Sequence, residues 1–170
     1  VYSGLLLIVS LPFAISLLKP YQKSRILTFF NPDRDPLGAG YQIIQSKIAI
    51  GSGGFFGKGF LKGTQSYLEF LPEKHTDFIF TLFSEEFGFL GSIILLLLYI
   101  LLIYRIISIG FYAKSFFSKL FCFGFASAIF LYIFVNISMV LGLLPIVGAP
   151  LPIMSYGGSS MLSIMLGLSI

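Results

Sequence analysis

Charged residues are scarce in this chain. They make up 11% of its 170 residues, whereas they make up about 25% of a typical soluble domain. Apolar residues account for 56% of the chain and gather in long runs, and such runs indicate an integral membrane protein. Few residues remain outside the runs, which excludes a separate soluble domain.

Cysteine and histidine occur only once each, and their scarcity excludes two classes of site. Cys122 lies inside an apolar run, so it supports neither a disulfide framework nor a metal site, and we expect it to be a small buried hydrophobe. His75 has no second histidine with which to share a metal ion. No metal site is therefore predicted.

Basic residues exceed acidic residues, giving a net charge of +4. No basic stripe interleaved with aromatic residues occurs, so a nucleic-acid partner is excluded. The charge instead suits orientation in a membrane, contact with membrane lipids or an anionic substrate. The chain opens at Val1 and ends at Ile170 inside an apolar run, and we expect a piece of a longer polytopic protein.

Four apolar segments predict an all-α polytopic membrane protein with four transmembrane helices. They lie at about residues 1–18, 78–104, 120–144 and 156–170. The short connection between the second and third spans carries Arg105, Lys114 and Lys119 and no acid, which favours the cytoplasmic side. The long loop at about 19–77 is also basic on balance, so charge alone leaves the orientation open.

The long loop is expected to be functional, because structureless loops of this length are uncommon in compact domains. Residues 31–40 are dense in turn formers, and Tyr41–Ile50 fits a short amphipathic helix on the surface or against the bundle. Glycine-rich residues 51–63 follow. They lack the spacing of a P-loop, and a mobile linker is the favoured interpretation.

A helix that starts near Asp77 would sort its side chains into two arcs, at about 100° per residue. The polar and small arc is expected to face a bundle or a wet cavity, and contains Asp77, Thr81, Ser84, Glu85, Gly88, Gly91 and Ser92. The apolar arc is expected to face lipid or apolar partners, and contains Phe78, Ile79, Leu82, Phe83, Phe89 and Leu90. Glu86 falls on the apolar arc, so it needs a partner from another helix or marks a second polar pocket.

Four ionisable side chains fall within Glu73–Asp77, where the chain enters the second span. Unpaired charge is costly in a bilayer, so ionisable residues at this depth indicate function. Simpler interpretations stay open for each. Asp77 or Thr76 can cap the helix, His75 can be an interfacial side chain, and Asn136 in the third span can form an interhelical hydrogen bond.

Motifs occur along most of the chain. They are Asn31–Gly40, Gln45–Gly54, Gly57-Lys58-Gly59, Gly63-Thr64-Gln65, Phe70–Phe80, Glu85–Gly88, Asn136–Pro145, Gly148, Pro152 and Ser155–Ser159. In this order they resemble the SEDS family of bacterial shape and division proteins, the RodA, FtsW and SpoVE group. Gly57–Gly59, Gly63–Gln65 and Leu68–Phe70 look more like the RodA branch. Ala149 departs from the family, in which a larger aliphatic residue is usual here.

The resemblance implies a single SEDS membrane domain over residues 1–170. The family has roughly ten spans of bilayer length, and this chain matches about the last four, the C-terminal part. It also implies a multi-pass protein of the bacterial cytoplasmic (inner) membrane. Loop 19–77 would then be extracytoplasmic, and the active site would lie on that side.

The resemblance implies a peptidoglycan glycosyltransferase that polymerises lipid II, with Asp77 as the catalytic carboxylate. Such a carboxylate can act as general base on the acceptor hydroxyl, and a single displacement of undecaprenyl pyrophosphate should invert the anomeric carbon. The leaving group carries two phosphates. The candidate substrate-binding residues are Arg25, Lys58, Lys62, His75 and Glu86.

The resemblance also implies a class B penicillin-binding protein and the elongation machinery as partners. No cofactor is required by the residues, and a divalent cation such as Mg²⁺ stays an open alternative. Two other functions stay open. One is a lipid II flippase or transporter, for which Asn136 and Glu86 would line a polar cavity. The other is a non-catalytic membrane scaffold for a penicillin-binding transpeptidase.

Overall fold

The computed structural model describes residues 25, 27–28, 38–63 and 76–169. The expected first span at residues 1–18, most of the turn-rich segment 31–40 and His75 lie outside the described residues. These expectations stay predictions.

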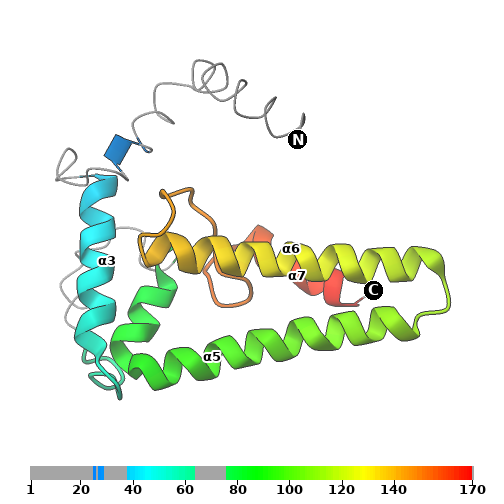
Figure 1. Ribbon diagram of the computed structural model, residues 1–170, viewed down its shortest axis with the longest axis horizontal. Coiled ribbons are helices and arrows are strands. Elements are labelled where there is room, and N and C mark those ends of the chain that lie inside the picture. Colours follow the sequence, from blue (N-terminus) through cyan, green and yellow to red (C-terminus); the bar gives the residue numbers. More distant parts are fainter. Residues whose placement is uncertain (1–24, 26, 29–37, 64–75, 170) are drawn as a thin grey trace, which may run out of the picture.

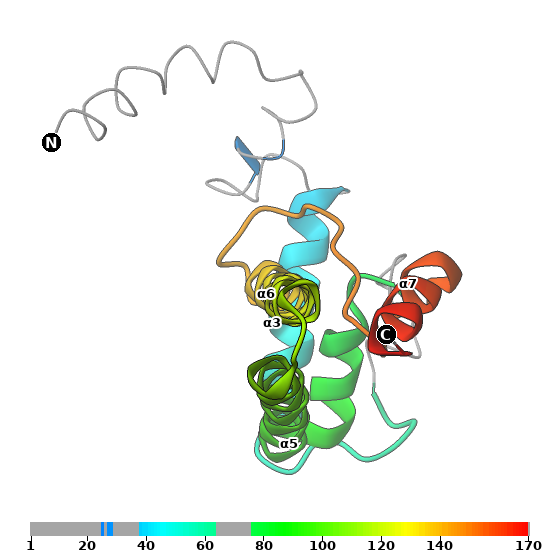
Figure 2. The same cartoon turned by 90° about the vertical axis from the view of Figure 1, so that its right-hand side faces the viewer.

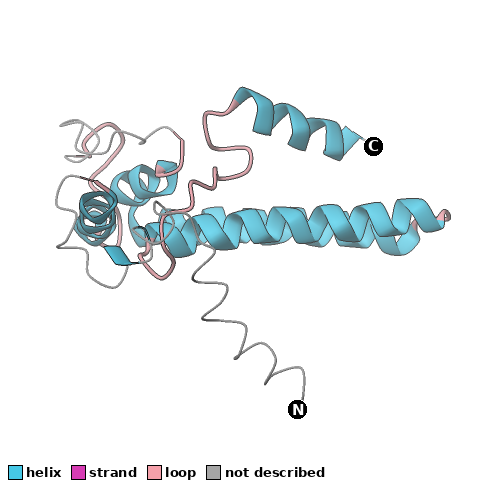
Figure 3. Ribbon diagram, turned by 90° about the horizontal axis from the view of Figure 1, so that it is seen from above, coloured by secondary structure: helices cyan, strands magenta, loops and turns pink. Residues whose placement is uncertain are grey.

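Four helices are described, and they confirm the all-α class. They are α3 at Ala39–Gly53, α5 at Ile79–Tyr112, α6 at Phe116–Val140 and α7 at Gly158–Ser169. α5 and α6 form an antiparallel hairpin, and α3 crosses the end at which α5 begins and α6 ends (Figure 1). α7 lies along one side of this hairpin (Figure 2). An irregular segment at 141–157 leads from α6 to α7 (Figure 3).

Among the described helices, α5 and α6 are long and apolar enough to cross a membrane. Their outer faces are apolar: Leu97, Leu98 and Ile100 are 58%, 60% and 62% exposed. A contiguous apolar surface marks contact with lipid or with another protein. Two of the four expected spans therefore have long apolar helices as counterparts, whereas α7 is a shorter apolar helix of 12 residues.

Helix boundaries differ from the expected spans at the hairpin tip. α5 continues to Tyr112 and α6 begins at Phe116, whereas the expected spans end at residue 104 and begin at residue 120. The predicted connection included Arg105 and Lys119, but long cationic side chains can stay on a helix while their charged ends reach polar surroundings. At its other end α6 stops before Gly142, which has a φ of 69° and so favours a helix end.

The buried core includes the place where α3, the start of α5 and the end of α6 meet, and it continues between α5 and α6 as far as Ile106 and Ala126. Ser46 of α3 is fully buried, and its hydroxyl donates to the carbonyl of Val140 in α6 at 2.9 Å. A Cβ on Gly53 of α3 would meet the carbonyl oxygen of Ser84 in α5, so glycine permits this close approach. Tyr41–Ile50 is confirmed as part of a helix against the bundle. The core's fully buried apolar residues include Phe78, Met139, Val140 and Leu151.

α5 is broken at Gly88, where the backbone has a φ of 68° and a ψ of −163°. The helix changes direction there (Figure 1). In an unbroken helix the amides of Phe89 and Leu90 would donate to the carbonyls of Glu85 and Glu86. The break leaves these four groups to be satisfied elsewhere, and unsatisfied backbone is costly in an apolar environment.

The loop after α3 supplies the partners that the broken helix lost. Phe89 and Leu90 donate to the carbonyls of Gly54 and Phe55 at 3.0 and 3.2 Å. In return, the amides of Lys58 and Gly59 donate to the carbonyls of Glu85 and Glu86 at 3.1 and 3.0 Å. The loop at 54–59 is therefore docked into the backbone of α5, and the prediction of a mobile linker is wrong for these residues.

The two-arc prediction for α5 is confirmed on its polar side. Thr81, Ser84, Glu85, Gly88 and Ser92 are buried. On the apolar side both expected surroundings occur, because Phe78 and Leu82 are 1% and 8% exposed and lie within the protein, whereas Phe89 is 56% exposed. The helix begins at Ile79, so Phe78 lies in the preceding turn and enters the core. The break at Gly88 then changes the direction of the helix, so one set of arcs cannot describe both parts.

Replacing either glycine at this junction should destabilise the protein. A Cβ on Gly88 would meet the backbone nitrogen of Gly57, and a Cβ on Gly57 would meet the carbonyl of Glu86. Both glycines also have positive φ. We expect Gly57→Ala and Gly88→Ala each to cost about 2 kcal/mol or more, measured as thermal unfolding in detergent micelles.

Gly51→Ala is the matched control, because Gly51 lies in α3 and no atom lies within 4 Å of the place that an added methyl group would take. Replacing a helical glycine by alanine stabilises a helix by up to about 1 kcal/mol. If Gly88→Ala unfolded at the same temperature as Gly51→Ala, the docked loop would not support the break.

Candidate functional site

Asp77 lies in a turn at residues 76–78, directly before α5. The N-cap residue of α5 is Phe78, which provides no side-chain cap, so Asp77 and Thr76 lie one and two residues before the cap position, and the capping interpretation of either residue stays a prediction. Asp77 is half-buried. The carboxylate therefore stands beside the end of the helical hairpin, at the junction of three segments of chain.

Asn136 of α6 holds this turn through hydrogen bonds. Its side chain is fully buried, and Nδ2 donates to the backbone carbonyl of Asp77 at 2.8 Å and to that of Ala149 at 2.6 Å. The expected interhelical hydrogen bond is thus replaced by two bonds to irregular backbone. One amide group holds together α6, the Asp77 turn and the segment after α6.

The segment at 141–157 forms one wall beside Asp77. Ser155 donates its hydroxyl hydrogen to the carbonyl of Thr76 at 2.9 Å. Gly148 has a φ of 79°, and a Cβ built on it would lie 3.2 Å from Oδ2 of Asp77. The Asp77 carboxylate therefore faces a backbone stretch that carries no side chain at the point of contact.

Two further hydrogen bonds anchor the same wall. The hydroxyl of Tyr99, in the second part of α5, donates to the carbonyl of Pro152 at 2.6 Å. Nη1 of Arg25 donates to the carbonyl of Ile146 at 2.7 Å. These contacts hold the segment at 141–157 from three sides, because Asn136 already binds it at Ala149.

An open cavity of about 590 Å³ lies next to the turn. Ile79, two residues after Asp77, lines it, as does Ser155, which binds the carbonyl of Thr76. The rest of the lining comes from Ile153, Met154, Tyr156, Gly157, Gly158 and Met161. A mostly apolar cavity of this kind suits a ligand with an apolar part.

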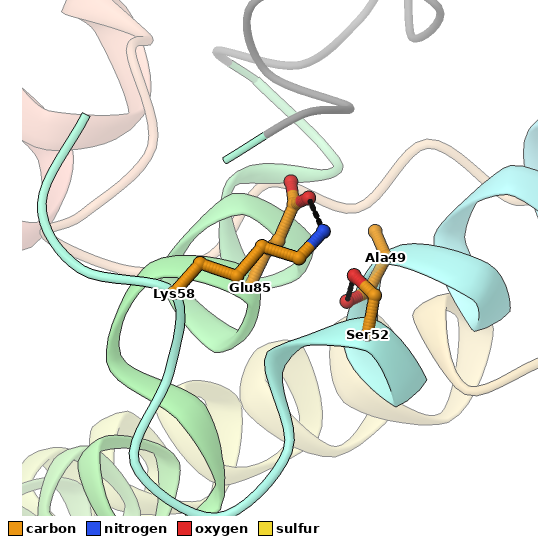
Figure 4. A network of polar contacts seen from close by, with 4 residues as sticks. All are labelled: Ala49, Ser52, Lys58 and Glu85. Atoms are coloured by element: carbon orange, nitrogen blue, oxygen red, sulfur yellow. Dashed lines mark hydrogen bonds and ion pairs between the residues drawn. The ribbon is translucent and has the colours of Figure 1, made fainter. Parts of the chain in front are cut away.

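Lys58 of the docked loop and Glu85 of α5 form an ion pair. Nζ of Lys58 lies 2.8 Å from Oε1 of Glu85 (Figure 4). Glu85 is fully buried, and the Lys58 side chain is 27% exposed. Burying a carboxylate is tolerated when a cation pairs with it. The same two residues are joined through their backbones, so the ion pair reinforces the docked loop.

The structure brings together only some of the expected substrate-binding residues. Arg25 contacts the wall that faces Asp77, whereas Lys58 is committed to Glu85. The side chain of Lys62 is exposed and forms no ion pair with the described residues. Glu86 is half-buried. Within the part of the chain that the structure describes, no group of three or more His, Cys, Asp or Glu could hold a metal ion.

Sequence reasoning missed the supporting residues of the site. It assigned no role to Ser155, Gly148 or Tyr99, although the first two lie in quoted motifs. The sequence feature that could have indicated these residues is the high proportion of proline and glycine at 145–158, which predicts irregular backbone. Irregular backbone near apolar spans needs side-chain donors, and Asn136, Ser155 and Tyr99 are such donors.

Comparison with known proteins identifies relatives over most of the chain. The family model of FtsW, RodA and SpoVE, described as cell cycle protein, matches residues 1–170. Peptidoglycan glycosyltransferase MrdB of Escherichia coli K12 is 56% identical over 154 residues, which cover 91% of this chain and 42% of that protein. Peptidoglycan glycosyltransferase RodA of Treponema pallidum is 47% identical over 152 residues, covering 89% and 35%.

A solved structure shows the same arrangement. It comes from work on the structural coordination of polymerization and crosslinking by a peptidoglycan synthase complex, and it matches with a TM-score of 0.72 at 38% identity, covering 98% of this chain and 45% of that one. The chain spans less than half the length of the relatives compared here. Since the family model matches every residue, this chain belongs to the FtsW, RodA and SpoVE family, the SEDS proteins.

Proposed function

We propose that the protein containing this chain is a peptidoglycan glycosyltransferase that polymerises lipid II into glycan strands, with Asp77 as its catalytic carboxylate. The observation that carries the proposal is the set of contacts that positions the turn containing Asp77. Asn136 and Ser155 bind the carbonyls of Asp77 and Thr76, and Gly148 faces the carboxylate. Two relatives at 56% and 47% identity are named peptidoglycan glycosyltransferases.

The proposed reaction is a single displacement. The Asp77 carboxylate accepts the proton of the acceptor sugar hydroxyl, and the hydroxyl oxygen forms a bond to the anomeric carbon of the donor. The bond between that carbon and the pyrophosphate oxygen breaks, so undecaprenyl pyrophosphate leaves with the electron pair. One displacement inverts the anomeric carbon and needs no second nucleophilic carboxylate.

Cations should stabilise the negative charge that develops on the leaving pyrophosphate. Arg25 has the best support, because it binds Ile146 in the wall that also contains Gly148. Lys58 would have to exchange Glu85 for the phosphates, so a structural role fits it better. Lys62, His75 and Glu86 stay proposed binding residues. A divalent cation such as Mg²⁺ would supplement these charges.

The proposal places Asp77 on the extracytoplasmic side of the bacterial inner membrane. α5 and α6 are helices long enough to cross it, and their tip carries Arg105, Lys114 and Lys119, a charge pattern that favours the cytoplasm. The chain would supply the last four of roughly ten membrane spans.

We propose a role in elongation and rod shape, together with a class B penicillin-binding protein, because a matching structure comes from a peptidoglycan synthase complex.

The two alternatives have less support. A flippase would need polar side chains available along a path, but Asn136 is fully buried and its Nδ2 binds two carbonyls. A pure scaffold would not require a carboxylate on a turn held by Asn136 and Ser155. A glycosyltransferase would use both the Asp77 carboxylate and the turn that positions it.

Asp77→Asn should abolish polymerisation without preventing membrane insertion. General-base catalysis contributes about 10²- to 10⁴-fold, so we expect a rate loss of about 100-fold or more with lipid II in liposomes. The amide is nearly isosteric, and the turn is held through backbone carbonyls, so the thermal stability should change little. A variant that makes glycan as fast as the wild type would show that Asp77 is not catalytic.

Asn136→Leu should remove the support of Asp77. It leaves the carbonyls of Asp77 and Ala149 without their donor, at about 1–3 kcal/mol for each buried group. Because Asn136 would position Asp77 without touching the substrate, we expect kcat to fall about tenfold or more while KM for lipid II changes less than threefold.

Ser127→Ala on the same helix is the control, because its exposed hydroxyl binds only the carbonyl of Gly124 within the described residues. It should leave both kinetic constants unchanged. Equal kcat values for Asn136→Leu and Ser127→Ala would remove Asn136 from the proposed site.

A further inference from the structure

A second cavity lies at the opposite end of the hairpin from Asp77. Its volume is about 790 Å³. The end of α5, the connection at 113–115, the start of α6 and the end of α7 line it. Figure 1 shows the tip of the hairpin far from α3 and from the start of α5. This cavity is therefore separate from the proposed catalytic site.

The cavity carries positive charge that no acid among the described residues balances in an ion pair. Arg105 and Lys114 line it, and Lys119 lies one turn into α6 and is exposed. From Phe87 to Ile170 the sequence contains no aspartate or glutamate. Among the described residues, these three cations form no ion pair. An anionic ligand would supply the missing charge.

Hydroxyl groups accompany the two cations in the lining. Ser108 comes from α5, Ser115 from the connection and Ser118 from α6. Cations and hydroxyls together are the groups that bind phosphate oxygens. Isolated interfacial lysines merely extend to the membrane surface, but these cations border a cavity large enough for a headgroup.

Aromatic side chains form the apolar wall of the same cavity. Phe117, Phe121 and Phe125 line it at successive turns of α6. Phe121 and Phe125 are stacked, with ring centroids 5.7 Å apart and planes 9° apart. A Cβ on Gly167 of α7 would meet the Phe125 ring, so α7 closes this side. Apolar aromatic side chains and cations that line one cavity suit a headgroup with an attached hydrocarbon chain.

We propose that this cavity binds an anionic glycerophospholipid from the leaflet opposite to Asp77. Its phosphate lies between Arg105 and Lys114, and an acyl chain follows the phenylalanine wall of α6. Basic pockets between transmembrane helices bind anionic lipid headgroups in this way. Charge complementarity favours this occupant, because an apolar helix from the rest of the protein would fill the volume but leave the cations unbalanced.

The test uses the complete protein, delipidated in detergent and titrated with phosphatidylglycerol while bound lipid is counted by native mass spectrometry. Phosphatidylethanolamine with the same acyl chains is the zwitterionic comparison. We expect phosphatidylglycerol to bind at least fivefold more tightly. Arg105→Gln and Lys114→Gln should each remove most of this preference, since both residues line the cavity.

Two variants separate a built site from general attraction to positive charge. Lys47→Gln removes one exposed cation from α3, at the other end of the molecule, and should leave the preference unchanged. Ser118→Trp keeps every charge but fills the cavity, and should reduce phosphatidylglycerol binding about as much as Arg105→Gln.

Several results would overturn the assignment. Equal binding of the two lipids by the wild type would do so, as would equal effects of Lys47→Gln and Arg105→Gln. Full binding by Ser118→Trp would show that the cavity is not the site, for example because another segment of the protein fills it. Displacement of phosphatidylglycerol by a lower concentration of polyprenyl phosphate would assign the cavity to that lipid instead.

Discussion

The need to satisfy backbone polar groups inside an apolar bundle governs this structure. Asn136 shows it most directly, because a single buried side-chain nitrogen donates to the carbonyls of Asp77 and Ala149. Without it, two irregular segments would enter the bundle with unsatisfied acceptors, and unsatisfied groups cost free energy wherever water is excluded. The turn that carries Asp77 is therefore stabilised by the amide that α6 provides, together with the hydroxyl of Ser155.

The break in α5 follows the same rule with backbone instead of side-chain partners. The loop at 54–59 gives two acceptors and two donors to the four groups released at Gly88, and the Lys58–Glu85 ion pair adds a side-chain contact to the same junction. The first part of α5, which follows Asp77, is thereby fixed against α3. Two glycines, Gly57 and Gly88, are needed because the two backbones approach too closely for a Cβ.

The sequence predicted the helical class, the polar face of α5 and the position of Asp77, because periodicity and charge are local properties of a chain. The sequence-based predictions failed where contacts between distant parts of the chain determine the local structure. The loop around Lys58 was expected to be mobile, since its glycines give no local sign of the helix break that binds them. Asn136 was expected to join two helices, whereas its partners are carbonyls 59 and 13 residues away along the chain. Phe78 was placed on a regular helix that starts near Asp77, whereas it lies in the turn before α5 and is 1% exposed.

The two ends of the hairpin differ in charge, and this difference follows from what each end must hold. Near Asp77, acidic groups are tolerated because amides, hydroxyls and Lys58 surround the start of α5. Beyond Glu86 the chain has no acid, so Arg105, Lys114 and Lys119 at the tip have no partner on α5, α6 or α7. Cations that only oriented the helices could stand on any exposed surface. Here two of them border a cavity with an aromatic wall, which favours a lipid phosphate as the balancing charge.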